Sequence, residues 1–305
     1  MTYEVKVDVS PVYELLSSFM VYTTRKWVDN LDIGLEWIEE THARFTPELD
    51  KSFEEASALP FSDYDILYAL AIERNPADDI HEFLNNLTET AVEILCRKVN
   101  PYVPAANNED LERVVHSYVP LLRIWNDSYF NEVRAQFLPL LEEDASEKNV
   151  LLHKMDADAL IEYATCGLIL EPALELEKVI IIPSVHMRPI NTYCFYHNTL
   201  LIQYPIDIPE IDEDEPSTCL IRLTRALSKP DRLRLLRYVA NDPKSLQQMM
   251  VDLNQTRDKL MHDLMLLRVA GLLRIHLVDQ DTEKFTIRPD GVSELQIFLE
   301  SYIRL

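Results

Sequence analysis

The pattern of apolar and polar residues divides the chain into a long helical part and a shorter mixed part. Residues 4–9 alternate between charged side chains and valine, which predicts one short strand. Ser10 and Pro11 follow, a pair typical of a helix N-cap and a proline in the first helical turn. From there to about Glu177 the apolar residues recur three and four positions apart. This spacing predicts a series of helices separated by prolines.

The pattern changes near residue 178, where β-branched and aromatic residues become frequent. They predict short strands over 179–183, 192–196 and 200–204, with a turn at His197 and Asn198. Residues 206–216 then hold six acidic residues and two prolines, a composition that does not form a packed element. We therefore expect a mainly helical domain with a small β element over 1–205, an acidic linker over 206–217 and a second domain over 218–305.

Helix-start and helix-stop signals are dense in the second domain. Ser245, with Gln248 three positions later, predicts a capping box and a short helix. Asn254 suits a tight turn, and Thr256 suits the N-cap of a longer helix that Gly271 ends. Two strands over 272–278 and 284–288, with a turn between them, and a final amphipathic helix complete the domain. The fold class predicted for the whole chain is therefore mainly α, with α+β character.

This order of elements, together with several short segments, resembles the winged helix-turn-helix of the arsenical-resistance-repressor (ArsR) family. The matching segments are LSKPDRLRLL at 227–236, SL at 245–246, LNQT at 253–256, LMH at 260–262, Leu264 and LRVAGL at 267–272. The resemblance covers about a quarter of the chain. Residues 1–216 resemble, more weakly, the long N-terminal extension of some members. The resemblance implies a DNA-binding homodimer, joined through helices near 219–227 and 292–305, that reads a two-fold-related operator.

The resemblance also implies which residues meet DNA. The side chains expected at base edges are Arg257, Asp258, Met261 and His262. Those expected at phosphates are Ser245, Thr256 and Lys259, and those expected to reach DNA from the wing are Arg274, Lys284 and Arg288. Lys284 and Arg288 are equally well interpreted as solvated strand residues. Asp258 and Asp263 depart from the family, which has small polar or basic residues at these positions.

The charge changes the picture only when it is divided between the domains. A net charge of −23 argues, taken alone, against nucleic acid as a partner. However, residues 1–216 carry 41 acidic and 15 basic residues, whereas residues 217–305 carry 11 and 14. The second domain is therefore mildly basic. We expect the acidic remainder of the chain to oppose nonspecific binding of DNA.

Composition excludes several classes of chemistry. With four glycines in 305 residues, the chain has no glycine-rich dinucleotide loop, phosphate loop or nucleophile elbow. The four cysteines lack CxxC spacing, and the helices corresponding to the two metal sites of the ArsR family lack the ligands for them. His186, Cys194 and His197 are a conceivable zinc set, but three such residues at irregular spacing are more often polar hairpin residues. We expect no catalytic residues, no metal and no cofactor.

These observations favour a cytoplasmic bacterial transcriptional regulator, most simply a repressor, with an N-terminal domain that senses an unknown small-molecule effector or sets the dimer geometry. A charged N-terminus without an apolar run, and free thiols, favour the cytoplasm. No charge-free stretch is apolar enough for a membrane span. The alternative is a protein-interaction adaptor in which the second domain mediates dimerisation rather than DNA binding.

Overall fold

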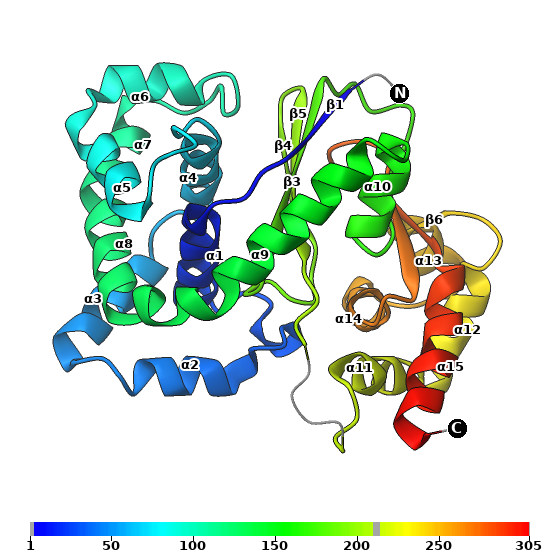
Figure 1. Ribbon diagram of the computed structural model, residues 1–305. Coiled ribbons are helices and arrows are strands. Elements are labelled where there is room, and N and C mark those ends of the chain that lie inside the picture. Colours follow the sequence, from blue (N-terminus) through cyan, green and yellow to red (C-terminus); the bar gives the residue numbers. More distant parts are fainter. Residues whose placement is uncertain (1–2, 210–213, 305) are drawn as a thin grey trace. The chain divides into compact units, whose positions relative to one another are not determined.

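The computed structural model describes residues 3–209 and 214–304, and it is mainly helical with two small mixed sheets (Figure 1). It forms two compact units. The first comprises residues 3–149 and 176–206, and the second comprises residues 150–175 with the described part of 207–305. No helix in the described ranges is long and apolar enough to span a membrane.

The first unit is built around α1 (Pro11–Thr24), the dark blue helix in Figure 1. Its start is as predicted, because the Ser10 side chain accepts a hydrogen bond from the amide of Val12. Every residue from Val12 to Thr23 is buried, so this helix is covered on all sides. Polar side chains on such a helix need partners inside the protein, which determines how Glu14, Ser17 and Ser18 are used.

A four-stranded sheet lies beside α1. Its strands, in spatial order, are β1 (Glu4–Val7), β3 (Lys178–Ser184), β5 (Thr199–Pro205) and β4 (Thr192–Tyr196). β1, β3 and β5 run parallel, and β4 is antiparallel to β5. All four strands are confirmed, and His197 has the positive φ (50°) expected of the predicted turn. The sheet joins residues near position 5 to residues near position 180, so the ends of this unit are held together.

The described residues of the first unit form further helices, and two of these segments are π-helical. The further helices are η1 (Val28–Asn30), α2 (Gly34–His42), α3 (Pro47–Ser57), α4 (Asp63–Ile72), α5 (Ile80–Glu89), α6 (Val92–Val99), α7 (Asn108–Arg113), η2 (Val114–Tyr118), α8 (Val119–Trp125), η3 (Asn126–Phe130) and α9 (Asn131–Leu152). Of these, α3, α4, α5 and α8 pack against α1. Helical structure is continuous from α7 to α9, so Pro120, one of the prolines expected to separate helices, does not do so. Pro120 falls in the first turn of α8, where a missing amide donor costs little.

An ion pair secures the chain where β1 leads into α1. Arg74 donates two hydrogen bonds to the Asp8 carboxylate, at 2.9 and 3.0 Å, and one to the hydroxyl of Tyr13. Burial alone would raise the pKa of Asp8, but the hydrogen bonds and charge of Arg74 outweigh it and hold that pKa below its usual value. The carboxylate therefore stays ionised and fixes the end of β1 against the residues that follow α4.

In its described residues, the second unit carries the last turn of α9, six further helices and a second four-stranded sheet. The helices are α10 (Ala157–Ala164), α11 (Thr218–Leu227), α12 (Pro230–Tyr238), α13 (Leu246–Asp252), α14 (Arg257–Val269) and α15 (Pro289–Ile303). The strands, in spatial order, are β2 (Leu168–Leu170), β7 (Leu273–Leu277), β8 (Glu283–Ile287) and β6 (Lys244–Ser245). The predicted strand pair after α14 is confirmed in position and is antiparallel.

The structure corrects the prediction for residues 150–175, which were assigned to a helical N-terminal domain. Residues 168–170 form β2, which pairs in parallel with β7 and so belongs to the second unit. A three-residue apolar strand is too short to show the alternation by which strands are recognised. The predicted linker over 206–217 contains no helix or strand in its described part, and residues 210–213 of it lie outside the described residues.

Candidate nucleic-acid interface

Two helices joined by a tight turn form the centre of the candidate interface. The Ser245 hydroxyl accepts from the Gln248 amide at 3.3 Å, and the Gln248 side chain accepts from the Ser245 amide at 2.9 Å. This is the predicted capping box at the start of α13. Asn254 has the expected positive φ of 48°, and Thr256 caps α14 through the amide of Lys259. The hydroxyls of Ser245 and Thr256 therefore fix helix ends, whatever else they contact.

The two sides of α14 differ sharply in exposure. Leu260, Leu264 and Leu267 are buried and attach the helix to the rest of the unit. The base-contacting residues expected from the resemblance lie together on the opposite, exposed side, and they are Arg257, Asp258, Met261 and His262. They occupy positions i, i+1, i+4 and i+5, which share one helix face. Asp263 points inward instead, where it pairs with the buried guanidinium of Arg232 at 3.4 Å.

Positive charge gathers at the N-terminal end of α14. The Lys259 ammonium contacts the Asp231 carboxylate at 2.6 Å, and the Arg234 guanidinium contacts the same carboxylate at 2.7 Å. The hydrogen bond and charge of Lys259 hold the pKa of Asp231 below its usual value. Two cations thus share one anion, and Arg257 has no ion pair among the described residues. The start of α14 therefore combines exposed cations with the positive end of a helix dipole.

Arg288 was expected to contact DNA from the wing, and the structure corrects this expectation. Its side chain is only 9% exposed and donates to the Gly271 carbonyl at 2.6 Å and to the Glu294 carboxylate. Gly271 sits at a φ of +67° beyond the end of α14, and a Cβ on Gly291 would lie 2.5 Å from the Gly271 oxygen. Arg288 is therefore part of the contact that joins the end of α14 to the start of α15.

We predict that Arg288→Ala destabilises the protein and does not remove a direct contact to DNA. The substitution leaves the Gly271 carbonyl without its donor, a loss of about 1–3 kcal/mol. Urea unfolding of the full chain measures this change. Lys284→Ala is the matched control, because Lys284 is partly exposed on β8 and makes no ion pair among the described residues. An Arg288→Ala variant as stable as Lys284→Ala would contradict the structural role.

The other predicted wing residues contribute unequally. Arg274 is only a third exposed and contacts Glu162 of α10 at 2.6 Å, so its charge is neutralised within the unit. Lys284 is partly exposed and makes no ion pair among the described residues, so its charge can still reach DNA. The turn between β7 and β8 exposes the carboxylates of Asp279 and Asp281, which phosphates would repel. The candidate interface is therefore the exposed face of α14, with Lys284 as the one predicted wing residue left free.

Exposed apolar side chains lie on α11 and α15, which pack against each other. These side chains are between 41% and 61% exposed, and they are Ile221, Val292, Ile297, Leu299, Tyr302 and Ile303. On α15, Val292, Leu299 and Ile303 share one face by their spacing, whereas Ile297 lies on another face. A row of exposed apolar residues of this kind is typical of an interaction site. The two helices are those through which the resemblance implies dimerisation.

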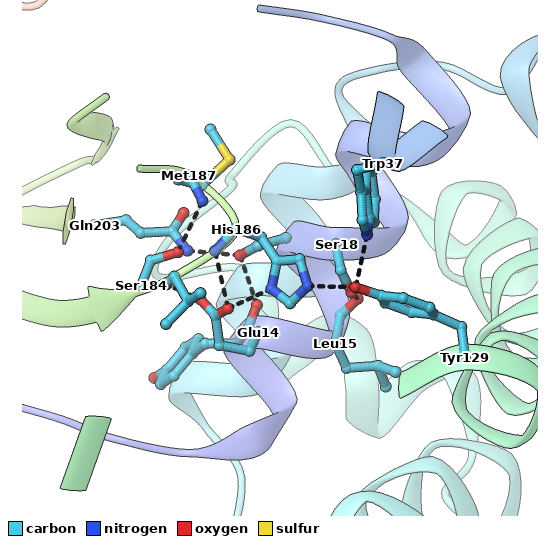
Figure 2. Close-up of polar contacts among 12 residues, drawn as sticks. Glu14, Leu15, Ser18, Trp37, Tyr129, Ser184, His186, Met187 and Gln203 are labelled. Carbon is cyan, nitrogen blue, oxygen red and sulfur yellow. Dashed lines mark hydrogen bonds and ion pairs between the residues drawn. The ribbon is translucent and has the colours of Figure 1, made fainter. Parts of the chain in front are cut away.

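A polar cluster buried in the first unit contains His186, one of the three residues considered for zinc (Figure 2). The His186 Nδ1 atom is 2.6 Å from the Glu14 carboxylate, and its Nε2 atom is 2.9 Å from the Tyr129 hydroxyl. The Trp37 indole donates to that same hydroxyl at 2.9 Å. Since an ionised carboxylate can only accept, we infer that Nδ1 carries the proton directed at Glu14 and that Nε2 of the neutral ring accepts from the Tyr129 hydroxyl.

The three residues considered for zinc have other roles. Both ring nitrogens of His186 are occupied, His197 forms a turn, and the Cys194 thiol donates to Asp65 at 3.4 Å. Burial and the nearby Asp65 raise the pKa of Cys194 to about 12, which disfavours the thiolate that zinc requires. Within residues 3–209 and 214–304, no group of three or more His, Cys, Asp or Glu side chains is arranged to hold a metal.

Comparison with known proteins adds no relative. No protein-family model matches the chain, and no curated protein and no solved structure is significantly similar to it. The functional argument for this protein therefore rests on the arrangement of its own residues.

Proposed function

We propose that residues 217–304 are a winged helix-turn-helix that binds double-stranded DNA and that the protein is a transcriptional regulator, most simply a repressor. The observation that carries the proposal is the exposed face of α14, which follows a capped helix and a tight turn. Its leucines are buried, while Arg257, Met261 and His262 face outward. An α-helix presented in this way fits the major groove of B-DNA.

The exposed side chains suit the groups at base edges. Arg257 matches the two acceptors of guanine, and Met261 offers an apolar contact to a thymine methyl. Asp258 accepts from the amino group of cytosine and repels nearby phosphates, so it favours specificity at the expense of affinity. The carboxylates at the tip of the hairpin weaken contact by the wing, which leaves α14 as the main source of binding.

The exposed apolar side chains of α11 and α15 support a homodimer. A two-fold axis through these helices would present two copies of α14, which would read two half-sites about one helical turn apart. The strongly acidic remainder of the chain would oppose nonspecific contacts, because carboxylates outside the interface repel phosphates. An effector bound to the first unit would then act by favouring one spacing of the two recognition helices.

Selection from a random double-stranded DNA library with the full chain tests the proposal. The full chain is needed because a fragment starting at 217 lacks β2, the strand that pairs with β7. We expect an enriched two-fold-related sequence whose affinity, measured by fluorescence anisotropy, falls steeply between about 50 and about 200 mM salt. A dimer that enriches no sequence and binds no DNA at low salt would overturn the proposal and favour the adaptor.

A further inference from the structure

A pocket of about 460 Å³ opens where α1 ends, in the first unit. This volume is within the range of small-molecule sites in proteins. Among its aromatic lining residues, Phe61 is 38% exposed and offers apolar surface, whereas Tyr22 and Phe53 are buried behind it in the core. Arg25, Lys26 and His42 also line the pocket.

The backbone beside the pocket adopts a conformation that costs energy. Arg25 and Trp27 have φ values of 55° and 60°. These lie in the left-handed region, which residues other than glycine and asparagine rarely adopt. Each such residue costs about 1–2 kcal/mol. These two residues turn the chain away from the axis of α1, which leaves Arg25 and Lys26 exposed next to the pocket. Such strain is frequent where a protein binds a ligand.

The two cations have no acidic partner. Neither Arg25 nor Lys26 forms an ion pair among the described residues, although residues 1–216 hold 41 acidic side chains. Instead both lie over aromatic rings: the Arg25 guanidinium is 4.5 Å from the centre of Tyr22, and the Lys26 ammonium is 3.2 Å from that of Phe61. Two cations without an ion pair among the described residues, held beside aromatic side chains, provide a site for one anionic group attached to an apolar body.

Carboxylates in the lining of the pocket limit the charge of the ligand. His42 contacts Asp50 at 3.1 Å, and the carboxylate of Glu54 is also part of the lining. A second negative charge on the ligand would meet these carboxylates. The lining therefore favours a monoanion over a dianion such as a phosphate monoester.

We propose that this pocket binds a small aromatic carboxylate, with its ring against the exposed side chain of Phe61 and its carboxylate held by Arg25 and Lys26. The ligand's role as an effector rests on the proposed function, whereas its binding does not. A carboxylate takes two hydrogen bonds from a guanidinium in one plane, and an ammonium completes its coordination.

Titration of the full chain with benzoate and indole-3-acetate tests the site, with ligand-observed NMR as the readout. We expect binding of at least one probe with a dissociation constant below about 1 mM. Benzyl alcohol, benzylamine and phenyl phosphate, which are neutral, cationic and dianionic, should bind at least tenfold more weakly. No carboxylate binding at that level, or phenyl phosphate binding equally well, would overturn the proposal.

Two variants locate the binding. Arg25→Gln and Lys26→Gln should each weaken the probe at least tenfold, while Arg44→Gln, a change of the same charge on a residue paired with Glu132, should leave it unchanged. Thermal unfolding of each variant checks that the fold is kept. Equal binding by all three variants would contradict the site. A probe that binds here and shifts affinity for a selected DNA would support the effector role, whereas binding without such a shift would overturn that role and leave the site intact.

Discussion

We expect Arg257→Glu to lower the affinity of the protein for its selected DNA about 100-fold. The substitution removes a two-pronged contact to a base, a loss of about 1–3 kcal/mol, and places a carboxylate among phosphates. Arg257 lies at the exposed start of α14 and has no ion pair among the described residues, so its loss should not disturb the fold. Anisotropy titrations with the selected duplex and with a scrambled duplex, at one fixed salt concentration, measure the effect.

Lys98→Glu provides the matched control, because it makes the same change in net charge on an exposed residue of α6 in the first unit. If binding depends only on overall charge, both variants will lose affinity equally and for both duplexes. If α14 reads bases, Arg257→Glu will lose more affinity for the selected duplex than for the scrambled one. An Arg257→Glu variant with wild-type affinity would contradict a base-reading role for α14.

The parts of this fold that were predictable from sequence depend on short-range interactions. Ser10, Ser245 and Thr256 each accept a hydrogen bond from an amide two or three residues later, and Gly271 takes a backbone conformation that few residues adopt. These interactions are encoded by residue types at fixed spacing. Leu260, Leu264 and Leu267 of α14 likewise recur at helical spacing, which indicates a single buried face.

The features that escaped prediction depend on residues far apart in the chain. β2 is identified only by its pairing with β7, more than 100 residues later. In the sequence, Arg288 is a charged residue at the end of a strand, which usually means an exposed side chain. It is buried because it donates to the Gly271 carbonyl and to Glu294, which come from other parts of the chain. The Glu14–His186 pair was also missed, although one signal was present: an acidic residue inside an apolar stretch of helix requires a buried partner.

Loss of the Glu14 carboxylate is expected to have the largest effect on stability. Glu14 is 1% exposed and His186 is 2% exposed, and the carboxylate also accepts from the backbone amides of Val185 and His186 at 3.2 Å. Glu14→Ala leaves three buried donors without an acceptor, and removing one partner of a buried pair typically costs about 3–5 kcal/mol. That is a large fraction of the stability of an ordinary domain. Urea unfolding at neutral pH measures the loss.

Three further variants separate the possible reasons for such a loss. Glu39→Ala, on an exposed residue of α2, should change the free energy of unfolding little and controls for the deletion itself. Glu14→Gln retains one oxygen acceptor and should lose less than Glu14→Ala. Combining Glu14→Leu with His186→Phe replaces the pair by apolar groups, which is often tolerated. Here the backbone amides of residues 185 and 186 still lose their acceptor and the Tyr129 hydroxyl loses one of its two partners, so the double variant should recover only part of the loss. Full recovery would mean that the carboxylate serves His186 alone and does not hold the end of β3 against α1.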